Sequence, residues 1–196
     1  MKVLVVHAHP VEESFNTALR RTIVETLIRG GHDVRLLDLY AEGFSPALTR
    51  RERLDYHDPA INVTPVQAYV DQLHWAEGLV LVYPTWWYGM PAMLKGWFDR
   101  VWLPGVTFDV VPDQPIKPHK MSNIRRFAVV TTYGSPWWLV RFYLGDPVRK
   151  VLGRGVRRLM ARDCRFDWHA LYRMDDVGQP ERAAFLAKVT AAFSRF

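Results

Sequence analysis

Residues 3 to 37 read VLVVHAHPVEESFNTALRRTIVETLIRGGHDVRLL, and this stretch decides the fold class. It opens with a continuous apolar run, Val3 to Val6, which is typical of a parallel strand buried on both faces. From about Asn16, apolar side chains recur at helical spacing until a pair of glycines ends the pattern. A second short apolar run follows at Val34 to Leu37. Strand, helix and strand in this order predict a βαβ unit with a right-handed crossover.

The same alternation continues along the chain. Further strands are predicted at residues 79–83, 127–131 and 165–172, and helices at 66–76, 90–102, 138–160 and after 180. The 138–160 pattern is expected to be interrupted at Asp146-Pro147 and at Gly153. Two long connections, 41–64 and 103–124, are polar or rich in proline. Five strands alternating with helices predict a single α/β domain over residues 1–196, with an open, doubly wound parallel sheet and helices on both faces.

Composition narrows the class of protein. The chain has 196 residues, of which 49% are hydrophobic and 23% charged, as in ordinary globular proteins. No apolar run approaches the roughly 18 residues that span a bilayer, and the start, MKVLVVHAHP, has no signal-peptide cleavage site. The single cysteine, Cys164, allows no internal disulfide and is expected to be a small apolar residue, buried or half-buried. These features favour a cytoplasmic protein.

Positive charge is concentrated in one segment. Residues 120–165 hold eleven Lys or Arg against two Asp, a local net charge of +9 in a chain of net charge +6. Such a segment suits nucleic acid, an anionic membrane, a phosphorylated cofactor or an acidic partner, or it is a solvated surface. Since no nucleic-acid-binding motif accompanies it, we expect no nucleic-acid partner.

Ligands of doubly wound sheets bind beyond the carboxyl ends of the strands, so the loops after strands one, three and four are the candidates. The first loop, HAHPVEESFN, has neither a Rossmann nor a Walker glycine pattern. Ser14 and Asn16 stand at a helix start, where an anion, a helix cap or both are favoured. His7 and His9 lack further ligands at metal-binding spacing, so we expect no metal site. His9 is interpreted as a hydrogen-bond donor to a ligand.

The other two loops are unusual in composition. PTWWYG at 84–89 forms an aromatic wall with free backbone N–H groups, and TTYGSPWW begins with Thr131, Thr132, Tyr133 and Gly134. An anion site beside such a wall suits a flavin nucleotide. Trp97 and Trp102 recur at helical spacing and are therefore predicted to belong to the core or to an interface.

Several motifs resemble those of the flavodoxin-like NAD(P)H:quinone oxidoreductases. These are H-x-x-x-x-S-F-N at 9–16, P-T-W-W-Y-G at 84–89, P-A-x-L-K-G-W-F-D-R at 91–100 and T-T-x-G at 131–134. The resemblance implies the strand order 2-1-3-4-5 and a homodimer with flavin at the subunit interface, FAD or alternatively FMN. It also implies a ping-pong reaction in which NAD(P)H passes a hydride to flavin N5, and a quinone then accepts two electrons.

The resemblance assigns roles to three groups of residues. The phosphate end of the flavin would be held by His9, Ser14, Phe15 and Asn16. The isoalloxazine would be lined by Pro84, Thr85, Trp86, Trp87 and Tyr88, and its other edge closed by Thr131, Thr132, Tyr133 and Gly134. The family's Tyr and His after the T-T-G-G turn have no His counterpart here, so Tyr143 is the nearest catalytic candidate.

Several alternatives remain open on the sequence. NADH and NADPH are not distinguished, and azo or nitroaromatic compounds are acceptors of the same flat kind as quinones. A protein of another class, an ancillary or regulatory flavoprotein subunit in peripheral contact with a membrane transporter, would use the basic 120–165 segment to dock.

Overall fold

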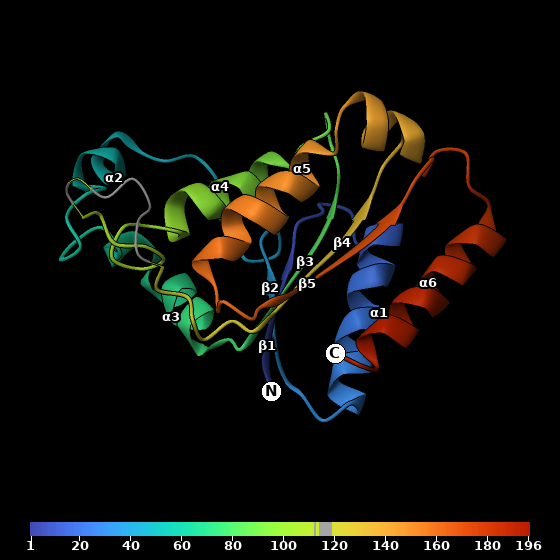
Figure 1. Cartoon of the computed structure of the whole chain (residues 1–196), viewed down its shortest axis with the longest axis horizontal. Coiled ribbons are helices and arrows are strands. Elements are labelled where there is room, and N and C mark those ends of the chain that lie inside the picture. The colour runs from blue at the N-terminus through green and yellow to red at the C-terminus, as the bar shows by residue number, and fades with distance from the viewer. Residues whose placement is uncertain (112, 114–118) are drawn as a thin grey trace.

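A computed structural model describes residues 1–111, 113 and 119–196, and its centre is a parallel sheet of five strands. The strand order is β2-β1-β3-β4-β5, as the resemblance implied, and neighbouring strands pair in parallel throughout (Figure 1). The strands are β1 (Lys2–His7), β2 (Asp33–Asp38), β3 (Gly78–Pro84), β4 (Arg126–Thr132) and β5 (Arg165–Leu171). Each lies within two residues of the predicted position. The switch in winding direction falls between β1 and β3.

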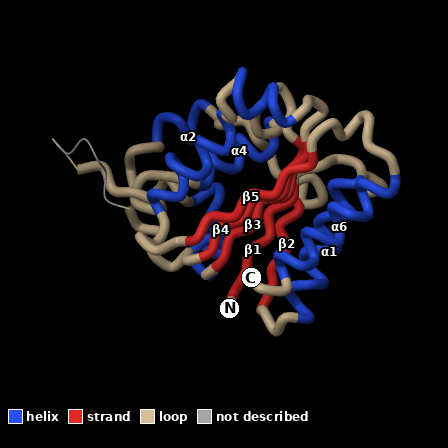
Figure 2. Tube along the Cα trace, turned by 45° about the vertical axis from the view of Figure 1, so that its right-hand side comes forward, coloured by secondary structure: helices blue, strands red, loops and turns tan. Residues whose placement is uncertain are grey.

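Helices cover both faces of the sheet, as predicted (Figures 1 and 2). On one face lie α1 (Phe15–Arg29) and α6 (Gln179–Phe193), whose side chains pack on Val3, Val5 and Val80. The other face is covered by α3 (Gln67–Trp75), α4 (Ala92–Val101) and α5 (Pro147–Lys150). The core on this second face includes Trp97 and Trp102, which confirms that these two rings are structural.

Three predicted segments differ in detail. The 41–64 connection contains a short helix, α2 (Arg50–Asp55), started by a Thr49–Glu52 capping box that the sequence reading passed over. The helix predicted at 90–102 begins two residues later, after Pro91 as its N-cap. Part of the 103–124 connection, residues 112 and 114–118, lies outside the described residues.

The helical pattern predicted at 138–160, with two interruptions, is confirmed in part, because no long α-helix forms there. Short helical segments replace it, namely η2 (Leu139–Tyr143), α5, η3 (Val151–Val156) and η4 (Arg157–Leu159). The break at Asp146 is confirmed, because that residue has φ 53°, in the left-handed region. Gly153 lies inside η3 and causes no break. The wide π-type turns of η2 and η3 follow no 3.6-residue period, so periodicity alone does not locate them.

Two further expectations concern membrane spans and the single cysteine. In the part of the chain that the structure describes, no helix has the length and apolar character needed to cross a bilayer. Cys164 is free and buried, as expected from the sequence, and burial raises the pKa of its thiol to about 11.

His7, at the end of β1, lies in a buried ion-pair network. Its Nδ1 is 2.8 Å from Asp38 Oδ2, and Arg20 Nη1 is 2.8 Å from the same oxygen. Burial lowers the pKa of His7 below its ordinary value of 6.5, although Asp38 opposes the shift. Burial raises the pKa of Asp38, but hydrogen bonds from His7 and from the Ala41 N–H outweigh it and the net pKa is lowered.

These shifts predict that stability is lost toward acid. A lowered folded-state pKa means that the unfolded chain takes up the proton first, so stability is present above pH 6.5 and falls below it. We expect the free energy of unfolding in urea to decrease between pH 7.5 and 5.5, by at most about 1.4 kcal/mol per pH unit for His7. The variant His7→Asn keeps a donor for Asp38 but has no imidazole to titrate, so its free energy of unfolding should decrease less over this pH range. An equal loss in both proteins would assign the effect to other groups.

Candidate functional site

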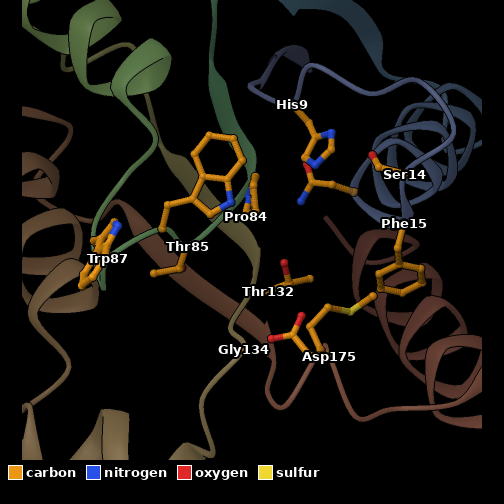
Figure 3. A pocket seen from close by; sticks show the side chains of 12 residues that line it. His9, Ser14, Phe15, Pro84, Thr85, Trp87, Thr132, Gly134 and Asp175 are labelled. Atoms are coloured by element: carbon orange, nitrogen blue, oxygen red, sulfur yellow. The ribbon is translucent and has the colours of Figure 1, made fainter.

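A cavity opens at the carboxyl ends of β1, β3 and β4, beside the switch point, as the fold rule predicts. Its volume is about 630 Å³. The loops after these three strands supply most of its wall, and the loop after β5 supplies the rest (Figure 3). The lining residues are His9, Ser14, Phe15, Asn16, Pro84, Thr85, Trp86, Trp87, Thr132, Gly134, Met174 and Asp175.

The first loop forms a polar pocket at the start of α1. Ser14 is the N-cap, and its Oγ accepts a hydrogen bond from the Thr17 N–H at 3.1 Å. Asn16 is only 3% exposed, yet neither its Oδ1 nor its Nδ2 has a partner among the described residues. An unpaired buried amide is costly, and its free donor suits an anion at a helix N-terminus. His9 accepts from the Val11 N–H at Nδ1, so its Nε2 is left to donate toward a ligand.

The aromatic loop turns sharply at Trp87 and Tyr88. Backbone bonds between Trp86 and Gly89 close the turn, with φ angles of 50° and 56° at the two residues between them. Bulky residues in this left-handed region cost about 1–2 kcal/mol each, and such strain is often found at functional sites. The turn leaves Trp87 98% exposed and Trp86 43% exposed, so both rings offer flat apolar surface beside the cavity.

Hydrogen bonds tie the second loop to the third. Thr85 Oγ1 lies 2.9 Å from Thr131 Oγ1, and the Thr85 N–H donates to Thr132 O. Tyr88 is joined through its hydroxyl to Ser135 Oγ at 2.9 Å. Thr131 is fully buried and does not line the cavity. It lies behind Thr85, which does, and its hydrogen bond positions that side chain.

A second cavity of about 460 Å³ continues from the first and shares four of its residues. Its lining residues are Thr85, Trp87, Tyr88, Tyr133, Gly134, Ser135 and Asp175. Tyr133 stacks on Tyr172 at 5.1 Å between ring centroids, and burial raises the pKa of its hydroxyl well above the ordinary value. A Cβ at Gly134 would come within 2.6 Å of Asp175 Oδ2, so a side chain there would narrow both cavities.

Thus the structure brings together twelve of the thirteen residues that the resemblance assigned to cofactor binding, with Thr131 directly behind them. Tyr143, the catalytic candidate, is 81% exposed on η2 and lines neither cavity. Met174, Asp175 and Ser135 line the cavities but were missed. The strand-end rule applied to β5 would have pointed to the segment that contains Met174 and Asp175.

The chemistry of the lining fits a flavin nucleotide. The unpaired amide of Asn16 and the first N–H groups of α1 suit a phosphate, and Trp86 and Trp87 offer flat apolar surface. Gly134 leaves the backbone open to close approach. No group of three or more His, Cys, Asp or Glu side chains among the described residues is arranged to hold a metal ion.

An open parallel sheet with this order and a cavity at its switch point defines a flavodoxin-like protein. The profile of the flavodoxin-like fold family matches residues 1–195, and the chain belongs to this family. The ribosyldihydronicotinamide dehydrogenase-like protein traD of Penicillium crustosum is 38% identical over 121 residues, which are 54% of this chain and 45% of that protein. The ribosyldihydronicotinamide dehydrogenase [quinone] of Pongo abelii is 33% identical over 128 residues, which are 56% of this chain and 54% of that protein.

Among solved structures, Smu.1420 of Streptococcus mutans UA159 superposes on the whole chain with a TM-score of 0.85 and 29% identity, and all of that chain is covered. This chain spans about half the length of the curated relatives that it matches.

Proposed function

We propose that the chain is a flavin-dependent NAD(P)H:quinone oxidoreductase that acts as a single domain. The observation that carries the proposal is the pair of continuous cavities at the switch point, with an unpaired buried Asn16 at one end and the strained Trp87–Tyr88 turn at the other. The names of the relatives, which include quinone dehydrogenases, support the same reaction.

Each part of the lining would have its own task. Ser14, Asn16 and the start of α1 would hold the phosphate, and His9 would donate to it or to the neighbouring chain of hydroxyls. Thr85, Thr132 and Gly134 would orient the ring system against Trp86 and Trp87. When bound, a flavin supplies hydride chemistry between NAD(P)H and a two-electron acceptor. The protein contributes orientation and exclusion of water.

FAD and FMN share the portion that these residues would contact. The resemblance implied FAD, whereas two structures with this fold, an azoreductase of Bacillus anthracis and a stress protein of Treponema denticola, contain FMN. The fold therefore accommodates FMN without further elements. Extraction and mass measurement of the bound flavin distinguishes the two.

We further propose a homodimer that closes the open side of the cavities. Four large aromatic side chains stand exposed on the segment after β4, beside the site, and such a patch marks an interaction surface. They are Trp137, Trp138, Phe142 and Tyr143. The Tyr88–Ser135 hydrogen bond connects this segment to the aromatic turn. Sedimentation of the purified protein tests the dimer. The cytoplasm is the proposed location, because the single cysteine is free and buried.

The decisive test is optical. We expect the purified protein to be yellow, to lose its flavin absorbance on anaerobic addition of NAD(P)H, and to recover it when a benzoquinone is added. An azo dye and a nitroaromatic compound serve as competing acceptors, and the acceptor with the highest kcat/KM defines the class. A protein that stays colourless with added FAD or FMN would contradict the proposal.

A further inference from the structure

A second, smaller cleft lies in the basic segment, outside the cavities of the proposed flavin site. Its volume is about 260 Å³. It is formed where η2, α5 and η3 meet Phe166, near the start of β5. The lining residues are Arg141, Asp146, Arg149, Lys150, Gly153, Arg154 and Phe166.

Four cationic side chains and one carboxylate line this cleft, and two of the cations pair with the carboxylate. Arg141 Nη1 and Arg149 Nη1 lie 3.6 and 3.9 Å from Asp146 Oδ2, longer than the roughly 2.7–3.2 Å of a direct hydrogen bond. The Asp146 side chain is 3% exposed, whereas those of the two arginines are 50% and 41% exposed. The buried carboxylate thus lies near both guanidinium groups, which remain about half exposed and line the cleft. The excess of positive charge suits a dianion, and arginine forks suit a phosphate monoester.

The backbone is shaped to keep this arrangement. Asp146 has a left-handed φ of 53°, and Gly145 before it has a φ of 69°. The first of these is a strained conformation for a residue with a side chain, and here it turns the carboxylate inward beneath the cations. A Cβ at Gly153 would lie 2.7 Å from the ring of Phe166, so only glycine allows the ring to stand as the apolar wall of the cleft.

The cleft and the second cavity of the proposed site are connected by one segment of the chain, residues 135–141. Ser135 lines the second cavity, and Arg141, which follows it by six residues on η2, lines the cleft. One extended dinucleotide with its nicotinamide in the second cavity can therefore place its other end here. Phe166 offers the flat apolar surface that an adenine favours.

We propose that this cleft binds the 2′-phosphate of NADPH, so that the chain uses NADPH in preference to NADH. The inference rests on the proposed function for its dinucleotide, but the cleft itself is defined by residues that the flavin site does not use. It also gives a role to part of the basic 120–165 segment.

The first experiment compares the two dinucleotides on the holoprotein. In Arg149→Ala and Arg154→Ala we expect the ratio of KM for NADPH to KM for NADH to rise about 10- to 100-fold, the effect of one charge-assisted hydrogen bond to phosphate. Arg162→Ala removes the same charge from an exposed position of the same segment outside the cleft and should leave the ratio unchanged. The proposal would be overturned if the ratio of the two KM values were the same in all three variants as in the wild type. It would also be overturned if the wild-type protein had no preference for NADPH.

The second experiment needs no turnover. Calorimetric titration with adenosine 2′-monophosphate, adenosine 5′-monophosphate and inorganic phosphate should show tightest binding of the 2′-phosphate, weakened about 10-fold or more in Arg154→Ala. Inorganic phosphate that binds as tightly would reduce the cleft to a general anion site and refute the nucleotide assignment. Binding of the 2′-phosphate without NAD(P)H oxidation would refute the proposed function alone, whereas oxidation of both dinucleotides at equal KM would refute this inference alone.

Discussion

Replacing Gly96 with alanine is expected to destabilise the protein by about 2–3 kcal/mol, because the new methyl group has no room. Gly96 lies on α4, where a Cβ would overlap the backbone of Pro46 from the long 41–64 connection. Backbone atoms cannot rotate away as a flexible side chain does, so α4 or the connection must shift. The gain in helix propensity from glycine to alanine, about 1 kcal/mol, offsets only part of this cost.

The matched control is Gly155→Ala. Gly155 lies on η3, has no left-handed φ, and a Cβ there would meet nothing within 4 Å. In thermal denaturation, the Tm of Gly96→Ala should therefore be about 4–12 °C below that of the wild type, whereas the Tm of Gly155→Ala should stay near it. If both variants melt together with the wild type, α4 does not approach Pro46 as the structure shows.

Replacing Asn16 with leucine is expected to separate stability from flavin binding. The Asn16 amide is buried without a partner in the described structure, so an apolar side chain of similar size should leave the apoprotein unchanged or stabilise it by up to about 1–3 kcal/mol. Flavin affinity should fall about 10- to 30-fold, since two hydrogen bonds of about 1 kcal/mol each are lost. Fluorescence titration of FMN and FAD into apoprotein, together with urea unfolding, measures both effects.

Asn62→Leu provides the contrast. Asn62 Nδ2 donates to Tyr56 O at 3.1 Å and to Pro104 O at 3.0 Å, so its removal leaves two carbonyls without that donor and should destabilise the fold by about 1–3 kcal/mol. An Asn16→Leu protein that loses stability as Asn62→Leu does would show that Asn16 is a structural residue. Unchanged flavin affinity would place the phosphate elsewhere.

Much of the fold follows from short-range patterns. Apolar runs such as Val3 to Val6 have the composition of strands covered on both faces, and each is found in the sheet close to its predicted position. The helix over Ala92–Val101 follows from apolar residues at regular helical spacing. The 138–160 segment was predicted only in part, because its π-type turns and the left-handed Asp146 obey no single period.

The candidate site was predictable to the extent that strand ends determine it. The loops after β1, β3 and β4 converge because parallel strands end at one edge of the sheet. Asp175 and Met174 were not found, since they follow the edge strand β5 in a polar turn with no motif. Tyr143 was chosen by chain order, whereas the structure places it on the exposed patch.

The sequence by itself determined the parallel sheet, its helices and the loops that meet at the switch point, because periodicity and strand polarity act within short stretches. Only the tertiary structure decided which groups in those loops stay unpaired, which side chains turn inward and which backbones touch. The burial of Asn16 without a partner, the hydrogen bonds from the second loop to the third, and the approach of Gly153 to Phe166 all depend on how separate segments pack. Local patterns carry no record of such contacts, since packing between elements creates them.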